Sequence, residues 1–559
     1  MNQYPDVSEH RVFFFFPFRS PNDSSPDIVN QTAESVLGTQ LSDLLKLPFL
    51  PSAVKGKDRA IAVPQKIWRP AKAQLSRDLH SHIHMLLGDI QPGKVDKHDD
   101  LSSPPLHELI PEARNVLTGR WGTGGPGLEI TLSEKARHRL GTPADQEMAV
   151  RIVIEAGYIQ FFRTGIGVLI LESSYRCAAE GVHLAEVILE ANHRLSHVQQ
   201  GYKHGLAWAT RSVGDALVPS LDSLAHALVT CGAGEIDAPG ASLGQTSIEW
   251  PRDSRVFIYT AVQFKKPFAD GEARRQFAYR LCNKYTSDYS VHEGRGRSTL
   301  VSAFENVLHG ASIEGGCAVV EEAGTVEFLE TYISKAVRQV YIPLALISFH
   351  EFRHLLRLTQ ESALYVSCER PSEPHIAILG FLRNELLNFH LFFRFSHASM
   401  ISHHNLAHQA WRQAFDLDRM LREVTSDVIE AEKVLSGQAE RLKAIAEREK
   451  ERQAAVVQEG KERRWRIWST VGTWVATYFA LSHLLEIWVK KAFVEPKLQL
   501  MTLKVFNKLA SVAEFAARQT QYHELESILE GVAVVVAIAV AAIVYHKSPS
   551  GAGKRHDHP

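Results

Sequence analysis

The chain has 559 residues, of which 45% are hydrophobic and 22% are charged, and its formal net charge is −1. This length exceeds one ordinary domain, because single hydrophobic cores stop growing at about 250–300 residues. The apolar content excludes a wholly disordered chain, and the near-zero net charge argues against direct nucleic-acid binding through a broad basic surface.

The first part of the chain is expected to stay in the cytoplasm. Its N-terminal sequence, MNQYPDVSEHRVFFFFPF, lacks the basic region, the long apolar region and the small-residue cleavage site of a signal peptide. The five cysteines of the chain are scattered and share no CxxC spacing. This pattern favours reduced thiols over a disulfide framework or a zinc knuckle.

Strand and helix signals alternate over the first 320 residues and predict an α/β or α+β body. Residues 1–145 contain the apolar strand HRVFFFFPF, ended by Pro17, and loops rich in Pro and Gly. Residues 146–320 contain MAVRIVIEAGYIQFFRTGIGVLILESS, which predicts a hairpin of hydrophobic strands with its turn at Thr164–Gly167. Residues 321–399 are predicted to be helical, with VYIPLALISF as buried core because this run is too short to cross a membrane.

Residues 400–465 predict a long stalk helix with a coiled-coil seam. Apolar residues recur there at alternating steps of three and four, as at the a and d positions of heptads, with Gln438 as a polar exception that can fix register. The residues predicted to contact other subunits of a homo-oligomer are Leu417, Leu421, Val424, Val428, Leu435 and Leu442. The alternative is a helix that packs on its own domain.

Two apolar segments, 466–489 and 528–546, predict a transmembrane hairpin. The first contains 19 residues without a formal charge, enough to cross about 30 Å of hydrocarbon, with tryptophans near both ends and basic clusters outside them. An amphipathic helical connection, 490–527, joins the two spans, and a basic tail, 547–559, follows. The basic flanks place both the body and the tail in the cytoplasm, although lysines in the connection weaken this orientation.

Hydroxyl side chains on the first predicted span are the candidates for a pore lining. They are Ser469, Thr473, Thr477 and Tyr478. The alternative is that these hydroxyl groups hold neighbouring helices together, as small polar residues do in membrane bundles.

A histidine motif offers a competing, enzymatic reading of the chain. His350, Glu351 and His354 fit HExxH, in which the two histidines bind zinc and the glutamate activates water, and Glu385 could supply a third ligand. Arg353 puts a cation inside the motif, which disfavours metal binding. We therefore predict that the protein is not an enzyme, and keep a membrane-anchored zinc hydrolase as the second alternative.

Other histidines form two short groups. His80, His82 and His84 lie in a segment expected to be solvated. A second group could sense pH or bind metal, although packing at an interface is the simpler expectation. It lies on one helical face near the start of the stalk and consists of His397, His404 and His408.

The order of a cytosolic α/β domain, a stalk helix and two spans resembles the CorA family of divalent-cation channels, whose stalk helices converge into a central pore. The segments SKAVRQVYIPLALISFHEFRHLLRL, LRNELLNFHLFFRFSHASMISHHNLAHQAWRQAFDLDRMLREVTSDV and FFRTGIGVLILES resemble a divergent bacterial CorA-like group. Some members of that group accompany type III CRISPR systems, where they are thought to act as membrane effectors that answer a nucleotide messenger. The resemblance covers roughly residues 320–545 and, more faintly, 148–200.

The resemblance implies an oligomeric, ligand-responsive channel or membrane effector in the bacterial inner membrane. Its partners would be the lipid bilayer, further copies of the chain and a small nucleotide or cation, and a divalent cation is the cofactor that the family suggests. The chain lacks the Gly-Met-Asn tripeptide that receives the ion in CorA transporters, so no ion-binding residue carries over. The alternative is a non-conducting, membrane-tethered signalling or scaffold protein.

Overall fold

The computed structural model describes the chain in sixteen stretches that together form a mixed α/β body and one long helix. The described residues are 4–19, 33–45, 65–87, 106–118, 128–132, 134–140, 148–177, 182–197, 207–208, 221–230, 248–250, 255–286, 299–322, 327–366, 373–392 and 394–492. The chain divides into two compact units, Met1–Arg441 and Leu442–Pro559. The predicted fold class is confirmed at the level of an α/β body followed by a long helix.

All described strands belong to one mixed sheet of 11 strands, with the order β2-β3-β5-β6-β1-β8-β11-β10-β9, with β4 beside β5 and β7 beside β4. Among these described strands, β8 and β11 form the one parallel pair. The strands are β1 (Val7–Arg19), β2 (Trp68–Pro70), β3 (His107–Leu109), β4 (Leu128–Thr131), β5 (Ala149–Phe161), β6 (Ile166–Cys177), β7 (Ala207–Trp208), β8 (Phe257–Phe264), β9 (Thr299–Phe304), β10 (Val307–Ser312) and β11 (Gly315–Glu321). Strands from 1–145 and 146–320 share this sheet, so the two predicted regions form one body.

Strand β1 lies in the middle of the sheet and explains why FFFFPF is so apolar. Its alternate side chains enter the two cores on opposite faces, Phe14 and Phe16 on one side and Phe13 and Phe15 on the other. The prediction that this strand ends at Pro17 is wrong, because β1 continues to Arg19. The ladder between β1 and β8 ends at Phe15, so the missing N–H of the proline breaks no ladder with β8.

The predicted hairpin is confirmed as β5 and β6, which pair antiparallel from Val150–Cys177 to Phe161–Gly167. The turn itself lies at Phe162–Gly165, slightly earlier than predicted, and Gly165 adopts a φ of 75° that a side chain would disfavour.

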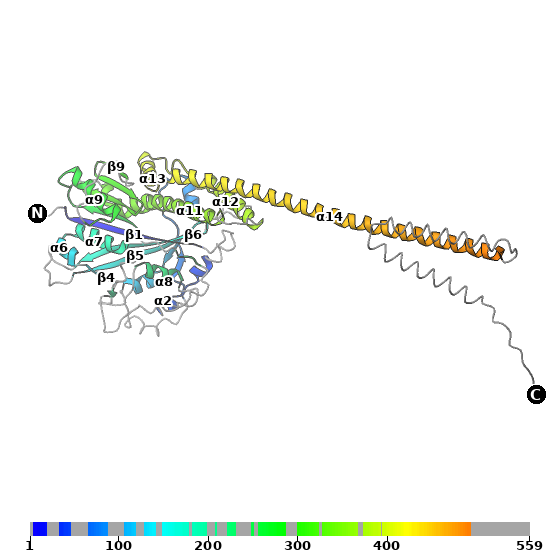
Figure 1. Ribbon diagram of the computed structural model, residues 1–559. Helices are drawn as coiled ribbons and strands as arrows, with labels where there is room; N and C mark the ends of the chain where they lie inside the picture. The colour runs from blue at the N-terminus through cyan, green and yellow to red at the C-terminus, as the bar shows by residue number, and fades with distance from the viewer. Residues whose placement is uncertain are drawn as a thin grey trace, which may run out of the picture. The chain divides into compact units, whose positions relative to one another are not determined.

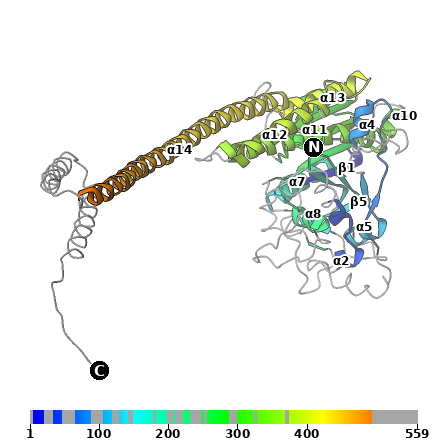
Figure 2. The same ribbon diagram turned by 90° about the vertical axis from the view of Figure 1, so that its right-hand side faces the viewer.

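Helices cover both faces of the sheet (Figure 1 and Figure 2). One face carries α2 (Leu41–Leu45), α5 (Pro111–Thr118), α6 (Glu134–Arg139), α7 (Leu184–Ser196), α8 (Leu221–Thr230) and α9 (Gly271–Asn283). The other face carries α4 (Ser81–Leu87), α10 (Glu327–Glu330), the π-helix η4 (Tyr332–Tyr341), α11 (Ile342–Val366), α12 (Glu373–Phe392), α13 (Ser402–Ala414) and the start of α14 (Leu417–Ala492). The apolar run VYIPLALISF lies across η4 and α11 and is buried, as predicted.

The predicted stalk is two helices, not one. Helix α13 ends at Ala414, and α14 begins at Leu417 after Asp416, which adopts a left-handed φ of 55°. Phe415 lies in this break and stacks on Phe352 with ring centroids 4.9 Å apart. We infer that burial of this ring fixes the break, since no proline or glycine marks it in the sequence.

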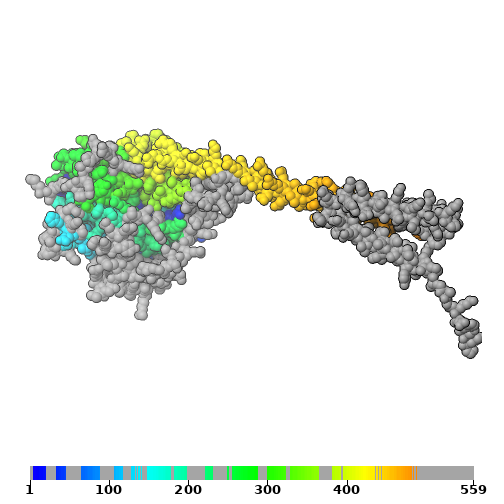
Figure 3. All heavy atoms as spheres, in the orientation of Figure 1, coloured from blue at the N-terminus to red at the C-terminus, as the bar shows by residue number. Residues whose placement is uncertain are grey.

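Four of the six residues of the predicted oligomer seam pack inside the chain. Leu417, Leu421, Val424 and Val428 are buried in the same core as α11 and α13, so packing of α14 on its own domain, the alternative reading, holds for these four residues. The side chains of Leu435 and Leu442 lie outside the described residues. Farther along α14 apolar side chains are exposed, for example Ile445, Val456 and Val457. Figure 3 draws the atoms of α14 as yellow and orange spheres.

Among the described residues, no helix combines the length and the apolar content that crossing a membrane requires. The finding includes the first predicted span, 466–489, which is part of α14. Serine, threonine, tryptophan and histidine stand among its aliphatic residues and lower its mean hydropathy. The second span, 528–546, the tail, 547–559, and all but the first residues of the connection, 490–527, lie outside the described part of the chain.

Close approach of α13 to the sheet depends on Gly316 in β11. A Cβ atom at this position would overlap the indole ring of Trp411. We expect Gly316→Ala to lower the free energy of unfolding by about 1–3 kcal/mol through overpacking, measured by urea denaturation. Gly437→Ala in α14 is the control, because a Cβ there meets no atom within 4 Å, and it is expected to be neutral or slightly stabilising. Equal stability of Gly316→Ala and the wild type would contradict the tight contact.

Candidate functional site

The HExxH motif lies on α11, and its two histidines and its glutamate are buried. The ring of His350 stacks on Phe162 at 3.9 Å, and its Nε2 lies 2.7 Å from the Thr164 hydroxyl oxygen. The ring of His354 packs against Phe389, with centroids 4.8 Å apart. Burial lowers the pKa of His350 to about 3, so its contacts with Phe162 and Thr164 involve a neutral imidazole. The two histidines therefore tie α11 to the β5–β6 turn and to α12.

Glu351 faces α13 and forms a buried ion pair. Its Oε2 accepts a hydrogen bond from Arg412 Nη1 at 2.8 Å. Burial raises the pKa of Glu351 to about 7, against the opposing effect of the guanidinium. A carboxylate held in this way is not placed to activate water beside the two histidines.

The proposed third zinc ligand is also engaged. Glu385 forms an ion pair with Arg357, a residue of α11 whose other nitrogen donates to the Thr164 carbonyl oxygen at 2.6 Å. Within the described ranges, no three His, Cys, Asp or Glu side chains are grouped so that they could hold a metal ion. These contacts leave the zinc-hydrolase alternative without its site, and we do not carry it forward.

Two of the stalk histidines are buried where α13 packs. The Nδ1 atom of His404 lies 3.0 Å from the Ser399 hydroxyl oxygen, and burial lowers the pKa of His408 to about 3. His397 is exposed. In the other group, His82 stacks on Phe395 with ring centroids 3.6 Å apart. These contacts fit packing better than metal binding.

Arg412 connects the buried motif to the beginning of the long helix. Its Nη2 donates a hydrogen bond of 2.7 Å to Asp418 Oδ1, in the first turn of α14, while its Nη1 holds Glu351. One guanidinium thus joins α11, α13 and α14. Spacing in the sequence gives no indication of this connection, because Arg412 and Asp418 lie on different helices.

Beyond the first unit, α14 presents aromatic side chains that no described residue covers. Trp465, Trp468 and Phe479 are 75%, 72% and 65% exposed, and Trp474 is also exposed. The basic residues of KERRWR, 461–466, precede and interleave with them. Exposed aromatic and basic side chains along one helix are typical of a segment that meets a membrane interface.

The predicted pore hydroxyls lie on this part of α14 and bond to their own helix. Ser469 donates to the Arg466 carbonyl oxygen at 2.9 Å, Thr473 to that of Ser469 at 2.8 Å, and Thr477 to that of Thr473 at 2.7 Å. Tyr478 is exposed and forms an edge contact with the Phe479 ring. Hydroxyl groups bonded in this way tolerate an apolar environment.

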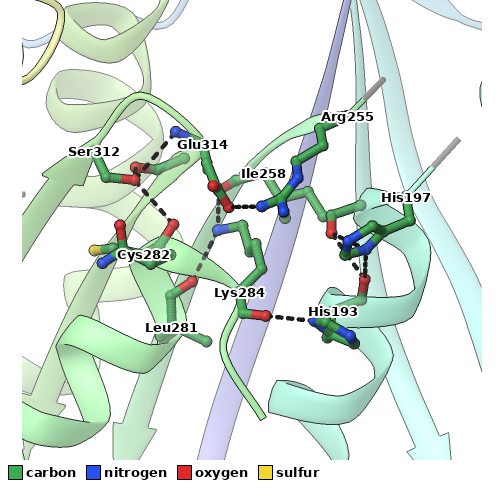
Figure 4. A network of polar contacts seen from close by, with 12 residues as sticks. His193, His197, Arg255, Ile258, Leu281, Cys282, Lys284, Ser312 and Glu314 are labelled. Carbon is green, nitrogen blue, oxygen red and sulfur yellow. Dashed lines mark hydrogen bonds and ion pairs between the residues drawn. The ribbon is translucent and has the colours of Figure 1, made fainter. Parts of the chain in front are cut away.

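A second polar network lies at one end of the sheet around Lys284 (Figure 4). Lys284 follows α9 with a left-handed φ of 58°, is buried, and donates from Nζ to the carbonyl oxygens of Ile258 and Leu281, both at 2.8 Å. Burial lowers the pKa of this lysine to about 8. Gly315 leaves the space for the ammonium group.

The contacts of Lys284 favour a structural role in holding the fold together over a role in ligand binding or catalysis. Ser312 donates to the Cys282 carbonyl oxygen, and Arg255 pairs with Glu314, so the network joins α9 to the beginnings of β8 and β11 (Figure 4). Ligands of open α/β sheets bind outside the carboxyl ends of parallel strands, which is the opposite end of these two strands. We therefore interpret Lys284 as a helix cap.

No protein-family model matches the chain, and no curated protein is significantly similar to it. The likeness to the CorA family consequently rests on the segments quoted above and on the order of the elements.

Proposed function

We propose that the protein is an oligomeric membrane effector of CorA-like organisation, placed at the bacterial inner membrane with its α/β body in the cytoplasm. The body responds to a ligand, and α14 carries the response to the lipid bilayer. The observation that supports this most is the continuity of α14, since one helix contains both Asp418, tied to the body by Arg412, and the exposed aromatic segment from Trp465 to Phe479.

Exposed apolar side chains also support association with further copies of the chain. Ile445, Val456 and Val457 lie on α14 between the body and the aromatic segment and are exposed in the single chain. Covering such residues in a helical assembly removes apolar surface from water, at about 25 cal/mol per Å². We expect the purified protein to be a homo-oligomer, which its mass in detergent will test.

The second candidate is a membrane-tethered scaffold that conducts nothing. It is favoured by the hydroxyl groups of Ser469, Thr473 and Thr477, whose protons are already donated to carbonyl oxygens of α14. Ion flux into liposomes that contain the full chain separates the two candidates. Flux supports the effector, whereas a defined oligomer that leaves the liposomes impermeable to ions supports the scaffold.

The membrane contact is tested by changing the two most exposed tryptophans. We expect Trp465→Ser combined with Trp468→Ser to weaken binding to vesicles by at least about tenfold, because burying each large side chain contributes about 1.5–3 kcal/mol. Flotation with vesicles that contain anionic lipid measures the bound fraction. The control is Gln453→Ser combined with Gln458→Ser, two exposed residues of the same helix outside the aromatic segment. Equal binding by the tryptophan and glutamine variants would remove this segment from the membrane contact.

A further inference from the structure

A cleft of about 660 Å³ lies in the body where α13 ends and α14 begins. Arg412 and the amide side chains of Gln409 and Gln413 line it from α13, and Asp418 lines it from α14. Arg394, Phe395 and Ser396, in the segment that follows α12, and Asp416, whose carboxylate pairs with Arg419, complete the wall. The cleft is therefore charged and rich in hydrogen-bond donors.

Two arginines of the cleft share one carboxylate. Asp418 Oδ1 lies 2.7 Å from Arg412 Nη2 and 3.4 Å from Arg394 Nη2. The side chain of Asp418 is 56% exposed and that of Arg394 is 44% exposed, whereas that of Arg412 is only 9% exposed. Because Glu351 fixes Arg412 from the buried side, the outer face of this guanidinium keeps its position even when Asp418 moves away.

An anion from solution can take the position of this carboxylate. Guanidinium groups bind carboxylate and phosphate oxygens through paired, charge-assisted hydrogen bonds. The amides of Gln409 and Gln413 lie one helical turn apart on α13 and can donate further bonds at the same cleft. The first turn of the 76-residue helix α14 adds the positive end of its dipole.

We propose that this cleft binds a small anion bearing a phosphate or carboxylate group, which replaces Asp418 on Arg394 and Arg412. Asp418 belongs to the first turn of α14, so its release removes the polar connection between α13 and α14. The idea that this site controls the membrane segment rests on the proposed function. The binding of an anion to the cleft does not depend on it.

The test measures binding of inorganic phosphate and of succinate to the full-length protein in mild detergent, at constant ionic strength. Calorimetric titration gives affinity, and the shift of the thermal midpoint gives an independent readout. Asp418→Asn removes the internal competitor while Arg412 stays paired with Glu351, so we expect this variant to bind the anion about tenfold or more tightly than the wild type. Adding Arg394→Gln should abolish the gain.

Arg383→Gln is the matched control, because it removes an exposed arginine that pairs with Glu432, away from the cleft. Binding of phosphate alone, or of succinate alone, supports the site and identifies the ligand chemistry. Absence of saturable binding of both probes by Asp418→Asn, or an affinity insensitive to Arg394→Gln, overturns the proposal. Flotation of the same variants with vesicles is scored separately, so failure of the membrane proposal and failure of the anion site give different results.

Discussion

Replacing Arg412 by methionine is expected to lower the free energy of unfolding by about 3–5 kcal/mol, because the change leaves the Glu351 carboxylate buried without its partner. Protonation of Glu351 relieves part of this cost. The pKa of this carboxyl group is already raised to about 7 by burial, and losing the guanidinium raises it further. The loss of stability should therefore be greater at pH 8 than at pH 6, which urea denaturation at the two pH values will show.

A second substitution separates the buried charge from simple loss of packing. Glu351→Gln in the Arg412→Met background removes the unpaired carboxyl group, and we expect at least half of the lost stability to return. The control is Arg383→Met, which breaks the exposed pair with Glu432 and should cost no more than about 1 kcal/mol. If Arg412→Met costs as little as Arg383→Met, the ion pair does not hold α11 to α13.

Acidification from pH 7 to pH 5 is expected to destabilise the protein by at least about 5 kcal/mol. The histidines responsible are at least nine-tenths buried, and burial lowers their pKa values from 6.5 to about 4 for His10 and to about 3 for His309, His350 and His408. Between pH 6.5 and these lowered pKa values, the histidines bind protons in the unfolded chain but not in the folded chain, so stability falls as the pH falls. At pH 5 each histidine costs about 2 kcal/mol.

Glu351 acts in the opposite direction. Its pKa is raised from 4.5 to about 7, so the folded chain binds the extra proton between these values and gains about 2 kcal/mol on acidification to pH 5. Burial also lowers the pKa of His354 well below 6.5, so this histidine adds to the loss. Five histidines outweigh one carboxyl group, and the net effect is a loss of stability. Urea unfolding at pH 7, 6 and 5, followed by tryptophan fluorescence, measures this dependence.

One histidine variant tests the origin of the pH dependence. Neither ring nitrogen of His408 has a hydrogen-bond partner within the described part of the chain, so His408→Leu removes the titrating group without breaking a bond. We expect the change in the free energy of unfolding between pH 6 and pH 5 to become smaller by up to about 1.4 kcal/mol per pH unit. The control is His483→Gln, which removes an exposed histidine of α14. An unchanged slope in His408→Leu would show that this histidine is not buried in its neutral form.

Local patterns in the sequence were sufficient for the elements themselves. Apolar alternation and a Gly-containing turn predicted the β5–β6 hairpin, and heptad spacing predicted a long helix, both of which the structure contains. These signals depend on the 2- and 3.6-residue periods of strands and helices, which are properties of a short stretch of chain.

Partners of the predicted residues depended on the tertiary structure. The seam from Leu417 to Val428 has the same spacing whether it meets another subunit or its own domain, and here it is buried in a core that also contains residues of α11, α12 and α13. The HExxH spacing likewise predicts which residues share a face of a helix, but not what packs against that face. In the structure Glu351, which a zinc site would need, forms its hydrogen bond with Arg412.

The sequence alone therefore determined that this chain has an α/β body followed by a long helix, because backbone hydrogen bonding and burial impose their periods locally. Only the tertiary structure decided where that helix begins, through the buried ring of Phe415, and which charges meet there. Arg412 and Asp418 belong to α13 and α14, and Arg394 belongs to the segment that follows α12. Side chains on separate segments of the chain meet only once those segments have packed.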